Sequence, residues 1–491
     1  MTQTAAIIGG GVIGGGWLAR FLLNGWNVQV FDPDPEAERK IDEVLHNARR
    51  SLPGLTNALL PPEGTLTFHS TIAEAVQGAT WVQESVPERL DIKQDTFAQI
   101  QNACDENAII GSSTSGFKPS ELQQAALRPE QIFVCHPFNP VYLLPLVELV
   151  TTDQNTANSI KAAQDILRKI GMYPLHLKKE IDAHVADRFL EAVWREALWL
   201  VKDGIATTQE IDDAIRYGFG IRWAQMGLFE TYRVAGGEAG MRHFMAQFGP
   251  ALSWPWTKLM DVPEFTDELV DMIADQSDAQ SGAYSIRELE RIRDDNLIAM
   301  MRALKAQDWG AGALLNAHEK NLRSGTALDL RADDIDDVSK PIVTGHRAVP
   351  LDWTDYNGHM NEAKYLEAFA DATDRFMELI GCDAAYIATG GSYFTAETHI
   401  RHLDEVHAGC VIRIETQVLM GGGKKMHLWH EMYEGDKLLA TGEHFLLHVS
   451  LETRRPSVPS VEIDKALQRI AAAHAKLPQP EGAGRAIGAP R

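Results

Sequence analysis

The sequence has few cysteines, no long apolar run and a deficit of positive charge, and each shortage excludes a class of protein. Four cysteines among 491 residues lie far apart without a Cys-x-x-Cys pair, so neither a disulfide framework nor a cysteine metal site is expected. No stretch reaches the roughly 18 apolar residues of a membrane span, and no basic segment precedes the apolar N-terminal stretch, so we predict no targeting signal. The 46 Lys and Arg against 68 Asp and Glu give a net charge of −22, which argues against a nucleic-acid partner. A reducing cytoplasm is the expected location.

The residues that are present describe an ordinary globular chain. Hydrophobic residues make up 45% and charged residues 23% of the sequence, which is enough apolar material for several cores. A chain of this length is typical of about three compact units.

The first 32 residues follow the pattern of a strand–helix–strand unit. A short apolar run at 5–8 precedes a glycine cluster, a helix-like stretch at 17–24 and a second apolar run at 28–31. Further strand-like runs, each followed by helical sequence, occur at 81–82, 108–110, 132–135 and 173–177. This alternation predicts an α/β domain with a mostly parallel, doubly wound Rossmann sheet over residues 1–180.

The sequence changes character after residue 180. Apolar residues at helical spacing between Asp182 and Asp203 predict one long amphipathic helix, and mostly helical sequence continues to residue 330. The segment 331–341 is acidic and ends in proline, which is typical of a connection between separately folded units. We therefore expect an all-α domain over 181–330 and a linker over 331–341.

The last third of the chain has the two-residue period of strands. Apolar and polar residues alternate on both sides of the glycines at 421–423, and a predicted helix at 361–380 precedes them. These patterns predict an α+β domain over 342–465, followed by a Pro/Gly-rich and disordered tail at 478–491. Ten of the 17 histidines lie after residue 340, but no His-x-x-x-His pair lies on a predicted helix, so we expect no metal site.

A glycine-rich motif lies where a dinucleotide site is expected. Gly9-x-Gly11-x-x-Gly14 opens a helix directly after a strand, and an acid closes the next strand. The first glycine permits a tight turn, the second lets a pyrophosphate approach the helix N-terminus, and the third lets helix and strand pack closely. Since Asp32 repels a 2′-phosphate, we expect NAD rather than NADP, while a glycine turn without a ligand is the alternative. The predicted cofactor contacts here are Gly9, Gly10, Gly11, Val12, Ile13, Gly14 and Asp32.

Polar residues follow two other predicted strands of the sheet. The cluster 112–116 follows the strand at 108–110, and His136 follows the strand at 132–135. Both positions are strand ends, where a doubly wound sheet binds its ligands. A histidine with a carboxylate, here Glu148, is the pair that oxidation of a secondary alcohol needs: the imidazole takes the hydroxyl proton, and the carboxylate balances the imidazolium. The alternative is a structural histidine at a strand end.

Residues 1 to about 320 resemble the 3-hydroxyacyl-CoA dehydrogenase family in these motifs. The resemblance implies a catalytic serine, histidine and glutamate and a cofactor-side acid, lysine and asparagine, which fall on Ser115, His136, Glu148, Glu88, Lys93 and Asn139. The sequence departs from the family at Asp187, where the family has a catalytic asparagine. Asp187 is therefore either catalytic or a charge complement to the substrate.

Within that family, the chain is similar to the branch that oxidises small polar 3-hydroxy acids, such as the L-gulonate and L-carnitine dehydrogenases. A quaternary ammonium group binds aromatic faces by cation–π attraction. Helix packing is the alternative role for such rings. The rings predicted to contact substrate are Phe138, Tyr142, Trp194, Trp223 and Phe229.

The segment Asp355-Tyr-Asn-Gly-His-Met-Asn361 precedes the predicted helix at 361–380. Over about residues 340–465 the chain resembles the hot-dog thioesterases, which carry an Asp, a Gly-His pair and an Asn at the start of the central helix. The resemblance implies that the Asp355 carboxylate attacks the thioester or activates water, while N–H groups at the helix start hold the oxyanion. A plain capping turn is the alternative.

The two resemblances together imply a bifunctional enzyme. Its expected reactions are the NAD-dependent oxidation of L-carnitine to 3-dehydrocarnitine and the hydrolysis of betainyl-CoA to glycine betaine and CoA. Since both families usually dimerise, we expect a homodimer without a nucleic-acid or membrane partner. Two alternatives stay open. One is a dehydrogenase of 3-hydroxyacyl-CoA or an L-gulonate-type acid with an acyl-CoA thioesterase or a non-catalytic, dimerising hot-dog domain. The other is a binding protein whose hot-dog domain acts mainly as a dimerising module.

Overall fold

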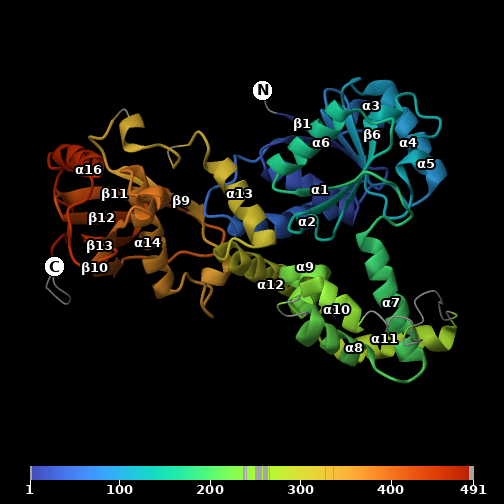
Figure 1. Ribbon diagram of the computed structural model, residues 1–491. Helices are drawn as coiled ribbons and strands as arrows, with labels where there is room; N and C mark the ends of the chain where they lie inside the picture. The colour runs from blue at the N-terminus through green and yellow to red at the C-terminus, as the bar shows by residue number, and fades with distance from the viewer. Residues whose placement is uncertain are drawn as a thin grey trace. The chain divides into compact units, whose positions relative to one another are not determined.

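The computed structural model describes residues 3–235, 238, 240–248, 257, 264, 266–326, 328–335 and 337–485 (Figure 1). The chain divides into two compact units. The first comprises Met1–Ala48 and Pro62–His318, and the second comprises Arg49–Pro61 and Glu319–Arg491.

The first unit is built on an eight-stranded sheet with the order β3-β2-β1-β4-β5-β6-β7-β8. Its strands are β1 (Thr4–Ile8), β2 (Asn27–Phe31), β3 (Leu66–Phe68), β4 (Trp81–Glu84), β5 (Ile109–Ser112), β6 (Ile132–Pro137), β7 (Leu146–Val150) and β8 (Tyr173–Leu177). All neighbouring strands are parallel except β6 and β7, which run antiparallel. The predicted Rossmann sheet is confirmed, and the antiparallel pair is an addition that the sequence pattern did not predict.

Helices cover both faces of this sheet. Figure 1 shows α1 and α6 on one side and α4 and α5 on the other. Burial on both faces explains why β6 has the unbroken run Ile132–Pro137, in which every residue is buried. The helices of this part are α1 (Val12–Leu23), α2 (Ala37–Ser51), α3 (Ile72–Ala75), α4 (Leu90–Ala103), α5 (Pro119–Gln123) and α6 (Ala157–Lys169), with short turns η1 (Leu52–Leu55) and η2 (Pro129–Gln131).

The chain is helical after β8, as predicted. The expected helix at 182–203 forms as α7 (Ala186–Lys202). It is followed by α8 (Thr208–Ala214), η3 (Ile215–Phe219), α9 (Gly220–Ala235), α10 (Gly240–Phe248), α11 (Asp267–Ser281), α12 (Ile286–Ala306) and α13 (Ala311–Arg323).

The second unit is a helix packed on an antiparallel sheet, which is the expected hot-dog arrangement. The strand order is β10-β13-β12-β11-β9, and α14 (Glu362–Leu379) contacts all five strands. Asn361 caps α14, because its Oδ1 accepts the N–H of Ala363 at 2.9 Å. The remaining elements are η6 (Ala332–Asp334), β9 (Ile342–Ala348), η7 (Leu351–Trp353), α15 (Ala384–Ile387), β10 (Gly391–His402), β11 (Val411–Gly422), β12 (Lys425–Glu434), β13 (Lys437–Ser450) and α16 (Val461–His474).

The predicted linker at 331–341 lies inside the second unit, because the change of unit falls earlier, at His318. Ala332 is buried in the core of that unit, with Ile335 and Val338 packed against it. The acidic residues that suggested a linker therefore belong to a segment whose apolar residues pack into the core. Of the predicted tail, residues 478–485 lie against the sheet, where Gly484 donates to Glu443, and residues 486–491 lie outside the described residues.

A short segment of the N-terminal sequence also belongs to the second unit. Residues 49–61 leave the first unit between β2 and β3. Leu52 and Leu55 are buried there, and the Asn57 N–H donates to Glu319 at 2.7 Å. The first unit is therefore not a single stretch of chain.

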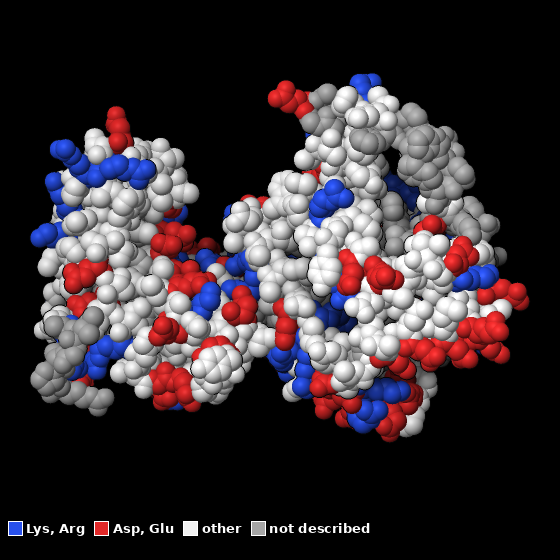
Figure 2. Space-filling view, turned by 90° about the horizontal axis from the view of Figure 1, so that it is seen from below, with Lys and Arg blue, Asp and Glu red and all other residues white. Residues whose placement is uncertain are grey.

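The surface carries the acidic excess of the sequence. On the face shown in Figure 2, Asp and Glu side chains gather in groups, and Lys and Arg side chains form groups of their own beside them. None of the helices in the described part of the chain is long and apolar enough to cross a membrane.

A chain of buried polar groups runs beneath α14 in the second unit. The His430 ring bonds the hydroxyls of Thr373 and Thr416 at 3.0 and 2.8 Å. His444 lies 3.3 Å from the same Thr373 hydroxyl. Burial lowers the pKa of His444 to about 4 and holds the pKa of His430 well below its ordinary value. Both imidazoles are therefore neutral in the folded protein.

These histidines predict that the second unit loses stability in mild acid. Between pH about 6.5 and 4 the unfolded chain binds protons that the folded rings exclude, so the free energy of unfolding falls as the pH drops. At pH 5.5 the loss is about 1.4 kcal/mol for His444. Calorimetric scans at pH 5.5 and 7.5 should show a smaller acid shift for His444→Asn than for the unaltered protein. The exposed His402→Asn serves as control, and equal shifts in all three proteins would contradict the assignment.

Candidate active sites

The glycine turn after β1 has the close approaches that its spacing predicts. Gly9 has a φ of +97°, and a Cβ there would lie 2.6 Å from the Ser85 carbonyl oxygen. A Cβ on Gly14 would lie 1.8 Å from the oxygen of Gly9, whereas a Cβ on Gly11 would meet nothing within 4 Å. The turn is therefore packed on its inner side and open at Gly11, where a pyrophosphate can reach the first N–H groups of α1.

Asp32 is tied to this turn at the end of β2. Its Oδ2 accepts the N–H of Gly10 at 2.5 Å. The nearby cations are already paired, since Lys40 lies 2.5 Å from Asp34 and Arg39 binds two glutamates at 2.8 and 2.7 Å. The 2′-phosphate of NADP would be repelled by the Asp32 carboxylate, and neither Lys40 nor Arg39 is left unpaired to bind it. The pocket therefore fits NAD.

A cavity of about 280 Å³ opens beside the turn. It brings together Gly11, Val12 and Asn139, which were all predicted to contact the cofactor. Arg287 and Arg293 of α12 also line it, and both are paired with acids: Arg287 with Glu43 and Glu290, and Arg293 with Asp294. Ile13, in contrast, is half-buried and lies outside this lining.

His136 and Glu148 face each other across the antiparallel strands β6 and β7. The strand register makes them direct partners, which explains how residues twelve positions apart meet. His136 Nδ1 lies 3.0 Å from Glu148 Oε2, and the side chains are 8% and 0% exposed. The pair is therefore held in place by the sheet itself.

The second oxygen of Glu148 fixes the start of α7. Its Oε1 accepts the N–H groups of Val185 and Ala186, each at 2.9 Å. Burial raises the pKa of Glu148. The hydrogen bonds from His136 and from these two N–H groups lower it by more, so the net pKa lies below its ordinary value. Glu148 is thus a carboxylate that can stabilise an imidazolium.

Asp187 lies in the first turn of α7, on the other side of His136. Its Oδ2 is 3.6 Å from His136 Nε2. Burial raises the pKa of Asp187. The positive charge of His136 lowers this pKa and the negative charge of Glu148 raises it, and the net pKa lies above its ordinary value. The structure therefore places both carboxylates predicted from the sequence against the one imidazole.

His184 is a site residue that sequence reasoning missed. Its ring is buried 5.6 Å from that of His136, and its Nε2 bonds the Thr114 carbonyl at 3.2 Å. Burial lowers the pKa of His184, so the ring is neutral. Ala183 and His184 both have positive φ angles, at 57° and 50°, which is a conformation that costs roughly 1–3 kcal/mol for a non-glycine residue. The signal in the sequence that could have revealed His184 is a second histidine next to the family motif.

Glu88, which follows β4, lies beside Lys93 of α4. Lys93 is buried 3.3 Å from Glu88 and 2.8 Å from Glu84. Burial raises the pKa of Glu88, but the Thr114 hydroxyl and the Lys93 charge lower it to below its ordinary value. Glu84 is fully buried and was not predicted, although an acid that ends an apolar strand is a usable signal.

Ser115 lies on the loop after β5, next to Thr114, whose hydroxyl donates to Glu88. Its side chain is exposed. The loop places a serine at the same sheet edge as His136, as the motif predicts.

Only some of the predicted aromatic contacts lie near His136. The Phe138 ring packs edge-on against His136 with centroids 4.9 Å apart. Tyr142 lines the cavity near Gly11, and its hydroxyl donates to Asp294 at 2.6 Å. Trp194, Trp223 and Phe229 lie on α7 and α9 and are 56%, 36% and 70% exposed, with no described contact to His136. The structure therefore does not gather these three rings at the histidine.

Asp355 shapes the loop that leads into α14. Its Oδ1 accepts the N–H groups of Asn357 and His359, at 2.8 and 3.3 Å. The carboxylate lies six residues before Asn361, the cap of α14, so a carboxylate and the start of a helix occur on one loop. The capping role considered from the sequence is present, and a chemical role remains a prediction.

Three family descriptions match the chain. "3-hydroxyacyl-CoA dehydrogenase, NAD binding domain" covers residues 4–181, "3-hydroxyacyl-CoA dehydrogenase, C-terminal domain" covers 184–271, and "Thioesterase-like superfamily" covers 349–470. A solved FHMPC 5-dehydrogenase, an NAD+-dependent dismutase, shares 28% identity with a TM-score of 0.53, over 62% of this chain and 99% of that one.

Two full-length relatives carry one name. An L-carnitine dehydrogenase/betainyl-CoA thioesterase of Ruegeria pomeroyi is 75% identical over 99% of both chains. A protein of the same name from Agrobacterium fabrum is 56% identical over 99% of this chain and 98% of its own. With an NAD-binding domain, a dehydrogenase C-terminal domain and a thioesterase-like domain in this order, the chain belongs to the L-carnitine dehydrogenase/betainyl-CoA thioesterase family.

Proposed function

We propose that the first unit oxidises L-carnitine with NAD and that the second hydrolyses betainyl-CoA. The full-length similarity to enzymes named for both activities carries this proposal. The buried His136–Glu148 pair beside the glycine turn supports the first activity, and the carboxylate loop before α14 supports the second.

His136 is the proposed base. NAD bound at the glycine turn supplies the hydride acceptor. As the hydride leaves C3 of the substrate, the hydroxyl proton moves to His136 Nε2, because Nδ1 is engaged with Glu148. The negative Glu148 stabilises the imidazolium so formed. The products are 3-dehydrocarnitine, NADH and a proton.

Asp187 is the proposed contact for the cationic end of the substrate. In L-carnitine the trimethylammonium is separated from the carbinol carbon by one methylene. A substrate hydroxyl on His136 Nε2 therefore brings the cation close to the Asp187 carboxylate, which is 3.6 Å from that nitrogen. An asparagine, as in the acyl-CoA branch of the family, would supply no charge.

Five other residues have supporting roles in this proposal. Ser115 contacts the substrate from the loop after β5, while Glu88, Lys93 and Asn139 lie on the cofactor side. The Phe138 ring, stacked edge-on against His136, shapes the substrate pocket.

In the second unit, the Asp355 carboxylate is the proposed nucleophile or base. Water cleaves the thioester to glycine betaine and the CoA thiol. The N–H groups at the start of α14 would hold the developing oxyanion.

We infer that the chain forms a homodimer in the cytoplasm. Large apolar side chains such as Phe189, Trp194 and Phe229 are exposed on α7 and α9, which is unusual for a surface that meets only water. A second copy would cover them. Trp194, Trp223 and Phe229 remain predicted substrate contacts.

The role of His136 can be tested by substitution. His136→Ala should lower kcat for L-carnitine by on the order of 10²–10⁴, because the base is lost. Glu148→Gln should act in the same direction with a smaller effect. NADH binding, followed by fluorescence titration, should stay near that of the unaltered protein. His176→Ala, in the same sheet, is the control, and near-normal turnover by His136→Ala would place the base elsewhere.

The role of Asp187 can be tested with a neutral isostere of the substrate. Asp187→Asn should raise KM for L-carnitine about tenfold, because a charge contact of about 1.4 kcal/mol is lost. It should change KM little for 3-hydroxy-5,5-dimethylhexanoate, in which carbon replaces the ammonium nitrogen. Steady-state kinetics with both substrates separates the roles, since an equal loss with the two would make Asp187 part of the proton-transfer machinery.

The thioesterase assignment rests on Asp355. Asp355→Asn keeps an oxygen acceptor for the loop N–H groups but removes the charge, so thiol release from betainyl-CoA should be abolished while carnitine oxidation continues. Glu362→Gln removes an exposed carboxylate from the first turn of α14 and should leave hydrolysis intact. Full hydrolysis by Asp355→Asn would reduce the residue to a loop cap.

A further inference from the structure

Two loops of the second unit meet beside the start of α14. The loop before α14 and the loop after β10 form an antiparallel bridge between His359 and His407. The Met360 N–H donates to the Val406 carbonyl at 2.8 Å, which fixes the two backbones together. Residues 48 positions apart in the sequence are therefore neighbours.

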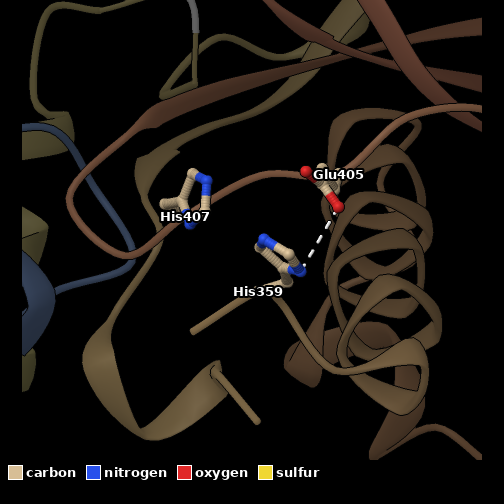
Figure 3. A group of neighbouring side chains, drawn as sticks. All are labelled: His359, Glu405 and His407. Carbon is tan, nitrogen blue, oxygen red and sulfur yellow. Dashed lines mark ion pairs between the residues drawn. The ribbon is translucent and has the colours of Figure 1, made fainter. Parts of the chain in front are cut away.

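Three metal-ligating side chains converge at this bridge (Figure 3). One ligand atom from each of His359, Glu405 and His407 lies within 4.8 Å of the other two. His359 Nδ1 is 3.3 Å from Glu405 Oε2, and the two imidazole rings lie 4.6 Å apart. The His359 and Glu405 side chains are 33% and 61% exposed, so a cation can reach them from solvent.

The hydrogen bonding of His407 favours a metal ligand. Its Nδ1 lies 3.1 Å from the Gly358 carbonyl oxygen, which can only accept a hydrogen bond. Nδ1 therefore carries the proton, and Nε2 keeps the lone pair that a cation needs. A backbone carbonyl that orients an imidazole in this way is the usual outer partner of a metal-bound histidine.

We propose that His359, Glu405 and His407 bind one divalent transition cation of the zinc class. Two imidazoles and one carboxylate suit zinc rather than magnesium or calcium, which prefer oxygen ligands alone. Ligand atoms about 2.0–2.1 Å from zinc in a tetrahedron lie about 3.3 Å apart, which is the His359–Glu405 separation. The third ligand atom lies within 4.8 Å of these two, so it has to move closer when the cation binds, and water completes the shell.

The cation would act as a clamp on the loop that carries Asp355. The Asp355 N–H donates to the His359 carbonyl at 2.9 Å, and the Asp355 carboxylate accepts the His359 N–H. A cation shared by the two loops therefore restrains the segment 355–361. The binding site itself does not depend on the proposed thioesterase activity.

Binding of Zn²⁺ and Co²⁺ to the full-length, untagged and chelator-treated protein tests the proposal. Calorimetry should show one tight Zn²⁺ equivalent, and bound Co²⁺ should give a visible d–d spectrum without a thiolate charge-transfer band. His407→Gln and Glu405→Gln remove a ligand, so each should weaken binding by more than the roughly 10–100-fold that loss of an outer partner causes. His402→Gln, an exposed histidine at the end of β10, should bind like the unaltered protein.

Hydrogen exchange provides a second readout that does not use activity. Zn²⁺ should slow exchange in residues 355–361 of the unaltered protein but not of His407→Gln. Unchanged protection from exchange in strands β10 to β13 of each variant shows that the second unit is folded. Absence of stoichiometric binding, a thiolate band, or equal affinity in all four proteins would overturn the proposal.

Discussion

One buried carboxylate organises the dehydrogenase site. Glu148 has no solvent contact, so its charge has to be balanced by donors, and three are present: the His136 ring and the N–H groups of Val185 and Ala186. Through its two oxygens Glu148 holds both the His136 imidazole and the first turn of the helix that carries Asp187. Removal of either set of donors would leave a buried charge partly unpaired.

The other polar groups of the site lie together because they follow the ends of neighbouring strands. The glycine turn, the Glu88–Lys93 pair and the Ser115 loop all follow parallel strands, so their polar groups meet at one edge of the sheet. The helical part adds Asp187 and the neutral His184 from the other side. The residues proposed for cofactor binding and proton transfer thus share one frame, while the proposed charge contact with the substrate lies in the first turn of α7.

The local patterns in the sequence predicted most of the fold and the core of the site. The glycine spacing, the acid at Asp32 and the alternation of strands and helices are short-range signals, and each led to the observed element. The partnership of His136 with Glu148 was inferred from chemistry, but its cause, an antiparallel β7 in a mostly parallel sheet, is a matter of long-range register. The same holds for the meeting of His359 with His407, which no spacing along the chain reveals. Acidic composition was a poor guide at 331–341, because three apolar residues decided the packing.

The path of residues 49–61 has a consequence for how such a fusion can be divided. The backbone passes from the first unit to the second at Ala48, returns at Pro62, and passes over again after His318. No single cut in the gene separates the two units as complete pieces. A fragment ending at residue 318 would retain Leu52 and Leu55 but lose the part of the second unit in which they are buried. The remaining fragment would lack residues 49–61. The chain therefore connects the two units at three places and not only at one junction between them.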